Sequence, residues 1–232
     1  MNAPALDPGP WAGRRLADRS LAGAVLDGLD LSNAVIERVN LRGASLRGVR
    51  LAGASLAQVD LRGAHLEGAV LHGAEGQRLD LDGAFLDDVD ARGLVLSQSA
   101  LPQARGRGLR LAGACLRAVE IEGAVLGDLD LEGASLEGVA LVGCTLAGLR
   151  LAGARLAACR LERCSLRGVE GAGAVLRACR LRRLEVADLA LTGATLRSCR
   201  GIDRGLREAL VAAGARLEPG LLGRLLGRGG PG

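Results

Sequence analysis

The stretch LRGASLRGVRLAGASLAQVDLRGAH, residues 41–65, decides the fold because it repeats every five residues. Each unit starts with Leu, and the residue two places before the next Leu is Ala or Val. The other positions hold mostly Gly and polar residues. A period of five fits neither the 3.6-residue turn of an α-helix nor the two-residue alternation of a strand.

The same register runs through most of the 232 residues. Every fifth residue from Leu16 to Leu196 makes 37 positions, and 33 are Leu, Ile or Val; the exceptions are Gly76, Ala91, Gly106 and Gly171. The residue two places before each of these positions is also apolar and usually smaller. From Ala24 to Ala194 it is Ala, Val, Leu or Cys, apart from Ser99. We take both positions to point inward. Two inward residues in five predict a backbone that turns a corner every five residues. Four sides then close a coil of about 20 residues, and coils stack by parallel strand pairing.

Several units carry Asp or Asn between the two inward residues: Leu29-Asp30-Leu31, Val39-Asn40-Leu41, Val59-Asp60-Leu61, Leu79-Asp80-Leu81 and Leu129-Asp130-Leu131. These resemble the motif of the pentapeptide-repeat family, a small residue, Asp or Asn, Leu and two variable residues. The resemblance covers roughly residues 16–200. It implies an all-β solenoid, a right-handed quadrilateral parallel β-helix, here of about nine coils. Arg, Ser, Val or Thr often replaces Asp here, which weakens any transfer of the family's acidic surface.

We expect three parts: a flexible tail or cap at 1–15, the β-helix at 16–200, and a helical cap and tail at 201–232. The first residues hold three prolines and no apolar run, so we expect no signal peptide. Trp11, in register with the ladder, is a candidate lid for the first coil.

After Arg200 the period stops, and Asp203 is a suitable N-cap for a helix over 204–213, with Gly214 after its end. A second helix is expected at about 219–227. Its leucines either fold back on the last coil or pair with a second copy in a homodimer; they are Leu221, Leu222, Leu225 and Leu226. Related proteins dimerise through such C-terminal helices, which favours the homodimer. The least regular stretch, 97–109, is either an extruded loop or a degenerate coil.

Composition excludes several classes of protein. One Phe, one Trp and no Tyr indicate a narrow interior of small aliphatic residues, and no apolar run is long enough to span a membrane. His65 and His72 point outward without a third ligand, and no P-loop or catalytic triad is present, so neither an enzyme nor a metal or other cofactor is expected. Cysteines without an export signal indicate free thiols in the cytoplasm. Five of the six occupy the smaller inward position as fillers of Ala size: Cys144, Cys159, Cys164, Cys179 and Cys199.

Charge is segregated along the chain, whose basic residues are all Arg. Residues 60–90 have a net charge of −6, 120–137 hold six acids and no Arg, and 150–200 have a net charge of +7. If the register is unbroken, an acidic set and a basic set share one side: Asp60, Asp80, Asp82, Glu120 and Glu122, then Arg160, Arg180, Arg182 and Arg200. This is either an ordinary solvated surface or a side that meets a partner.

The function favoured by the sequence is a non-catalytic rod that binds or scaffolds a macromolecule, with a protein as the expected partner. The resemblance implies an alternative, because some family members mimic DNA and bind DNA gyrase or topoisomerase IV, giving quinolone resistance or toxin immunity. A further alternative is nucleic-acid binding through the Arg-rich half. The lack of aromatic residues disfavours single strands, since bases stack on aromatic side chains.

Overall fold

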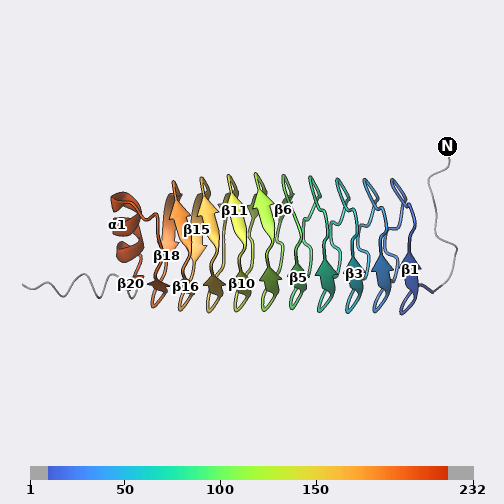
Figure 1. Cartoon of the computed structure of the whole chain (residues 1–232), viewed down its shortest axis with the longest axis horizontal. Helices are drawn as coiled ribbons and strands as arrows, with labels where there is room; N and C mark the ends of the chain where they lie inside the picture. Colours follow the sequence, from blue (N-terminus) through green and yellow to red (C-terminus); the bar gives the residue numbers. More distant parts are fainter. Residues whose placement is uncertain (1–9, 219–232) are drawn as a thin grey trace, which may run out of the picture.

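The computed structural model describes residues 10–218, which form a rod of stacked coils. Figure 1 shows the coils following one another along the long axis, with β1 near the N-terminal end and helix α1 at the other. All strand pairs are parallel, and partners are 20 residues apart along the coils, as Leu136 and Leu156 are, except in the last pair, where Leu196 is paired with Leu217. The fold is therefore the predicted parallel β-solenoid. It has about ten turns rather than about nine, because the first turn starts at Trp11.

One side of the rod is a continuous 11-stranded sheet. Its strands, in order, are β1 (Arg15–Ala17), β2 (Val35–Glu37), β3 (Ser55–Ala57), β4 (Glu75–Gln77), β5 (Val95–Ser97), β7 (Cys115–Arg117), β10 (Ser135–Glu137), β13 (Arg155–Ala157), β16 (Val175–Arg177), β19 (Thr195–Arg197) and β20 (Arg216–Glu218).

The second and third sides become regular sheets only toward the C-terminal half. The second has β8 (Glu120–Glu122), β11 (Ala140–Val142), β14 (Arg160–Glu162) and β17 (Arg180–Arg182). The third has β6 (Arg105–Arg107), β9 (Val125–Gly127), β12 (Thr145–Ala147), β15 (Ser165–Glu170) and β18 (Glu185–Ala190). Isolated parallel bridges continue both toward the N-terminus, and such bridges alone hold much of the fourth side, as between Asp90 and Arg110.

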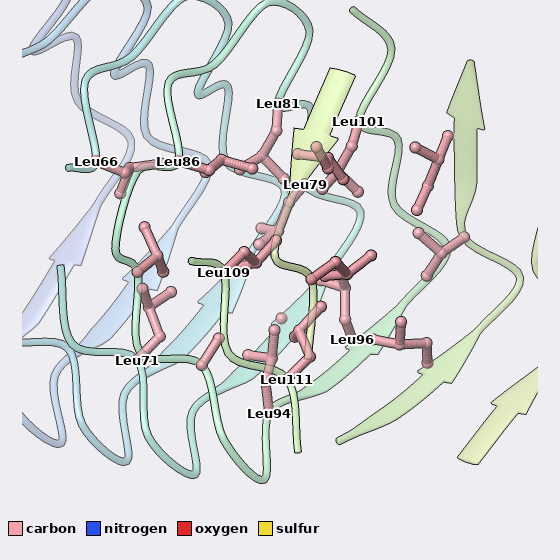
Figure 2. Close-up of a pocket in the computed structure, with 18 of the residues that line it drawn as sticks. Leu66, Leu71, Leu79, Leu81, Leu86, Leu94, Leu96, Leu101, Leu109 and Leu111 are labelled. Carbon is pink, nitrogen blue, oxygen red and sulfur yellow. The ribbon is translucent and has the colours of Figure 1, made fainter. Parts of the chain in front are cut away.

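The repeated inward residues make the core, as the sequence predicts. Leu136 is 2% exposed and pairs with Leu116 and Leu156 in the coils on either side. Figure 2 shows leucines such as Leu66, Leu86 and Leu109 pointing from different sides into the interior. The cavity left along the middle coils is about 80 Å³ and is lined by apolar residues only.

Three of the four exceptions in the Leu ladder are compensated by a larger residue three places later, and at the fourth, Gly171, a Cβ atom would lie 2.8 Å from Cδ2 of Leu191. Gly76, Ala91 and Gly106 are followed by Leu79, Leu94 and Leu109, where many coils have Ala or Val. A Cβ atom at Gly76 would lie 2.8 Å from the Cδ1 atoms of both Leu79 and Leu96, so these side chains already occupy the space. Core volume is thus maintained between positions rather than at each one.

Residues 97–109 stay in the coil. Ala100 bridges Glu120, β6 pairs with β9, and Leu101, Ala104 and Leu109 are buried. The prediction of an extruded loop is therefore wrong, and the prediction of a degenerate coil is confirmed. A Cβ atom at Gly106 would lie 2.7 Å from the backbone carbonyl carbon of Leu86, so the backbones approach closely there and only Gly fits.

Both ends of the described core are covered. At the first coil Trp11 is 8% exposed and joins the core, with the Arg14 guanidinium 6.0 Å from the ring centroid. At the last coil the carboxylate of Asp203 accepts a hydrogen bond of 2.8 Å from the backbone N–H of Leu206 and caps helix α1 (Arg204–Ala212). The predicted helical cap and its N-cap residue are confirmed.

Strand β20 was not predicted. After Gly214, whose φ is +91°, the chain returns to the first side and pairs with β19. The helix expected near 219–227 and its leucines, Leu221, Leu222, Leu225 and Leu226, lie outside the described residues, so the homodimer stays a prediction. Within residues 10–218, helix α1 is too short to cross a membrane.

Candidate macromolecule-binding surface

The 20-residue register aligns the charged residues singled out from the sequence on the second side. Bridges join Asp60 to Asp80, Asp80 to Ala100 and Ala100 to Glu120, without the shift that an extruded loop would cause. The alignment continues through β11 to Arg160, Arg180 and Arg200. We call this surface the bipolar side and define it by Asp60, Asp80, Asp82, Glu120, Glu122, Arg160, Arg180, Arg182 and Arg200.

The acidic half of the bipolar side is partly neutralised at its N-terminal end. Arg62 donates from Nε to Asp60 Oδ1 at 2.9 Å and lies 3.6 Å from Asp80 Oδ2. The hydrogen bond from Arg62 holds the pKa of Asp60 below its ordinary value. By contrast, Glu120 and Glu122 are exposed and form no salt bridge within residues 10–218. The free acidic surface is therefore centred on β8 and Asp82 rather than on Asp60.

Small side chains flank the β8 carboxylates. Ala100 and Pro102 precede them and Val142 follows, so a recess of about 150 Å³ adjoins Glu120 and Glu122. A basic side chain from a partner would meet two carboxylates and an apolar margin here, with Arg160 also lining the recess. The arrangement suits the aliphatic stem and charged head of Arg or Lys.

The basic half stacks like charges. Arg160 lies in register with Arg180, and Arg180 with Arg200. The nearest acid is Glu162, whose Oε1 lies 3.9 Å from Arg180 Nη1 and has no hydrogen-bond partner within the described chain. Because like charges directly opposite each other on neighbouring strands destabilise a sheet, this column costs stability.

Elsewhere the rod pairs opposite charges between successive coils. Arg38 donates to Asp18 through two hydrogen bonds of 2.6 and 2.8 Å, and Arg50 lies 3.3 Å from Asp30. The contact with Arg38 holds the pKa of Asp18 below its ordinary value. The stacked arginines of the basic half are a departure from this pairing rule.

The repeat itself assigns the chain to a known group. A family model for pentapeptide repeats, found in eight copies, matches residues 16–56, 54–93, 130–168 and 150–183, more than half of the sequence. The chain belongs to the pentapeptide-repeat family. No curated protein sequence matches this pentapeptide-repeat protein.

Solved structures of pentapeptide-repeat proteins are similar to it. HetL, involved in heterocyst differentiation regulation in the cyanobacterium Nostoc sp. strain PCC 7120, is 26% identical, with 80% of this chain and 84% of HetL covered and a TM-score of 0.39. QnrB1, a plasmid-mediated fluoroquinolone resistance protein, is 17% identical, with 85% and 98% covered and a TM-score of 0.40. A protein from the Arabidopsis thaliana thylakoid lumen is 20% identical, with 57% and 70% covered and a TM-score of 0.24.

Sequence reasoning missed two arginines beside the basic half of this pentapeptide-repeat protein. Arg163 and Arg183 occupy a corner where φ is +55° and +51°. The equivalent residue is Gly in most other coils, including Gly123 and Gly143. Left-handed backbone costs roughly 1–2 kcal/mol for a residue other than Gly. Aligning the sequence at a period of 20 would have shown this substitution.

The cysteines lie where the sequence places them. Cys144, Cys159, Cys164 and Cys179 are buried, and each thiol lies close to backbone carbonyls; Cys144 Sγ is 3.3 Å from the carbonyl oxygen of Ile121. Hydrogen bonding to Cys159 raises the pKa of Cys179 to about 11, so its neutral thiol is favoured. Their role as fillers stays a prediction.

The two histidines point outward, and they do not meet. His65 stacks on Phe85 with ring centroids 4.5 Å apart, and its Nδ1 lies 3.0 Å from Glu67 Oε1. His72 is exposed at a corner. In residues 10–218 no three His, Cys, Asp or Glu side chains are placed to hold a metal ion.

Proposed function

We propose that this pentapeptide-repeat protein is a non-catalytic rod that binds a macromolecule through its bipolar side. The observation that supports the proposal is the register: residues 20 apart in sequence put an acidic half and a basic half on one side of the rod. A solenoid presents such residues at fixed spacing on a rigid surface, which suits contact with an extended partner.

The partner that fits is a macromolecule with complementary charge, and we expect a protein at the acidic half. Exposed carboxylates of Glu120 and Glu122, in a recess partly lined by apolar side chains, would receive its basic side chains. Such contacts speed association and weaken as salt rises. The proposal places the protein in the cytoplasm, whose reducing conditions suit its free cysteines.

The test is capture of partners from the native host, with and without nuclease. Four reversals to Arg, at Asp80, Asp82, Glu120 and Glu122, are expected to abolish capture of the protein partner. The matched control reverses four exposed acids on other surfaces that form no salt bridge in the described chain: Glu75, Asp88, Asp128 and Glu132. Equal capture by both variants would contradict a role for the acidic half.

A DNA topoisomerase is a second candidate partner, because its DNA-binding surface is basic. The carboxylates of Asp82, Glu120 and Glu122, which form no salt bridge within residues 10–218, support this, whereas the pairing of Asp60 with Arg62 shortens the acidic surface. In a gyrase supercoiling assay at low salt, the protein is expected to inhibit the enzyme or relieve quinolone poisoning, and the four reversals should remove the effect. No effect of the native protein at micromolar excess would eliminate this candidate.

A further inference from the structure

We propose that the C-terminal coils bind the phosphate backbone of a nucleic-acid duplex through a cluster of six arginines. The Arg cluster consists of Arg160, Arg180 and Arg200 in one column, Arg182 beside them, and Arg163 and Arg183 at the adjoining corner. This deepens the proposed function by giving the basic half a partner of its own.

The Arg cluster is a concentration of charge that the fold does not need. Three arginines stack in register on the second side, whereas on the fourth side Arg150 pairs with Asp130 of the preceding coil. Two more occupy left-handed corner positions that most other coils give to Gly. Repulsion and backbone strain both oppose folding, so an anionic ligand that relieves the repulsion explains why this arrangement is tolerated.

The acids that lie beside the cluster do not cancel its charge. Glu162 lies between the arginines, 3.9 Å from Arg180, and Glu185 lines the neighbouring recess with Arg183. Glu120 and Glu122 also share a recess with Arg160. Six arginines against four acids leave a net positive surface. All six arginines are exposed and accessible to a ligand.

Hydroxyl groups adjoin the Arg cluster. Thr145 and Ser165, paired between β12 and β15, line a recess of about 270 Å³ together with Arg163 and Arg183. Arg with Ser and Thr hydroxyls is the donor set that proteins direct at phosphate oxygens. The recess is therefore a place where a phosphate group could be held between guanidinium and hydroxyl donors.

The spacing suits a regular polyanion. Adjacent coils are about 4.8 Å apart, so Arg160, Arg180 and Arg200 extend over roughly 10 Å, which corresponds to about three phosphates along one strand of a duplex. An acidic protein would need a buried aromatic or aliphatic anchor for affinity, and the Arg cluster offers none. The Arg cluster also contains no aromatic residues, which disfavours binding of single-stranded nucleic acid, because its bases stack on aromatic side chains.

The experiment is titration of a fluorescent DNA duplex of about 20 base pairs with the full chain, over a range of salt concentrations. If the six arginines each contact a phosphate, the logarithm of the association constant should fall with the logarithm of salt concentration at a slope of about −5. Replacing Arg160, Arg180 and Arg200 with Gln should reduce this slope by about 3. The matched control replaces Arg105, Arg107 and Arg155, exposed on other sides and without salt bridges in the described chain, and should keep the slope nearly unchanged.

A second pair of variants separates binding from folding. Arg163→Gly and Arg183→Gly restore the residue that most coils carry at this corner, so together they should raise the melting temperature while weakening duplex binding. A pair that lowers the melting temperature, or leaves duplex binding unchanged, would contradict the role given to the corner.

Three results would overturn the inference: no binding of the duplex at micromolar protein and low salt, equal loss in the control triple variant, or tighter binding of a poly-glutamate peptide than of the duplex. The last would indicate an acidic protein instead. Failure here leaves capture through the acidic half unaffected, because that test uses Asp80, Asp82, Glu120 and Glu122 and a different partner.

Discussion

Replacing Leu136 with Asp is the most direct test of the solenoid interior. Leu136 is 2% exposed and lies between Leu116 and Leu156 in β10. Losing the buried Leu side chain costs about 1.5–3 kcal/mol. Burial can raise the pKa of a carboxyl by roughly 3–5 units, which adds about 4–7 kcal/mol at neutral pH. The sum is comparable with the whole stability of a domain, about 5–15 kcal/mol, so cooperative folding should be lost.

Thermal and urea unfolding followed by circular dichroism measure the effect, with three companion variants. Leu136→Ala should cost about 2–5 kcal/mol and remain folded. Ser135→Asp, at the exposed neighbouring position, should change stability by less than about 0.5 kcal/mol. Leu136→Asn introduces a polar side chain of similar size that has no titratable carboxyl group. Because the folded-state pKa of the introduced carboxyl is raised, its penalty relative to Asn should shrink at acidic pH, below the carboxyl's ordinary range, and grow as pH rises. Normal melting of Leu136→Asp at neutral pH would refute the interior placement.

Three other perturbations test the core and the coil-to-coil pairing. The first replaces all five inward cysteines with Ala at once: Cys144, Cys159, Cys164, Cys179 and Cys199. We expect a modest loss of stability and no loss of partner capture. A bound metal detected by mass spectrometry would contradict their role as fillers. Gly106→Leu, which completes the Leu ladder in sequence, should lower the melting temperature, because its Cβ would lie 2.7 Å from the Leu86 carbonyl carbon; a stabilised variant would show that the ladder rule outweighs this contact. Arg92 holds the pKa of the buried Asp90 below its ordinary 3.8, so this pair stabilises the fold above the unfolded-state pKa and the contribution is lost as pH falls through the folded-state value. Asp90→Asn should flatten the acid limb of the stability curve, and an unchanged limb would exclude the pair as its source.

The interior could be predicted from sequence because each inward position has one requirement, an apolar side chain of the right volume. The ladder from Leu16 to Leu196 therefore fixes the register and even the cysteine positions. Compensation between Gly76 and Leu79 was missed, since volume is shared between positions three apart and the period of five treats them separately. Strand β20 was missed because one strand after a helix leaves no periodic signal.

The sequence predicts which charged residues align on the bipolar side, but not which of them remain free of ion pairs. A period of 20 places Asp60 and Asp80 together, yet which acids remain free depends on side-chain reach: Arg62, two residues from Asp60 on the same side, neutralises one and approaches the other. The same reach explains why Asp82, Glu120 and Glu122 differ from Asp60, although one acidic set contains all four. Ion pairing is decided by rotamers of exposed side chains, which a backbone period does not specify.

Stacked coils make every outward residue the neighbour of the residues 20 before and 20 after it. A charge on this rod can therefore be paired along its column or left exposed to a partner, unless a residue of its own coil pairs with it, as Arg62 does with Asp60. Asp18 with Arg38, and Asp130 with Arg150, follow the first course. The column of Arg160, Arg180 and Arg200 follows the second, because Arg180 lies between two arginines and Arg160 follows Ala140. Removing Arg200, which forms no salt bridge in the described chain, should relieve repulsion and raise stability, whereas removing Arg150 should lower it. This opposite response to equal losses of charge can be measured by unfolding, and it separates a surface shaped by folding from one shaped by a ligand.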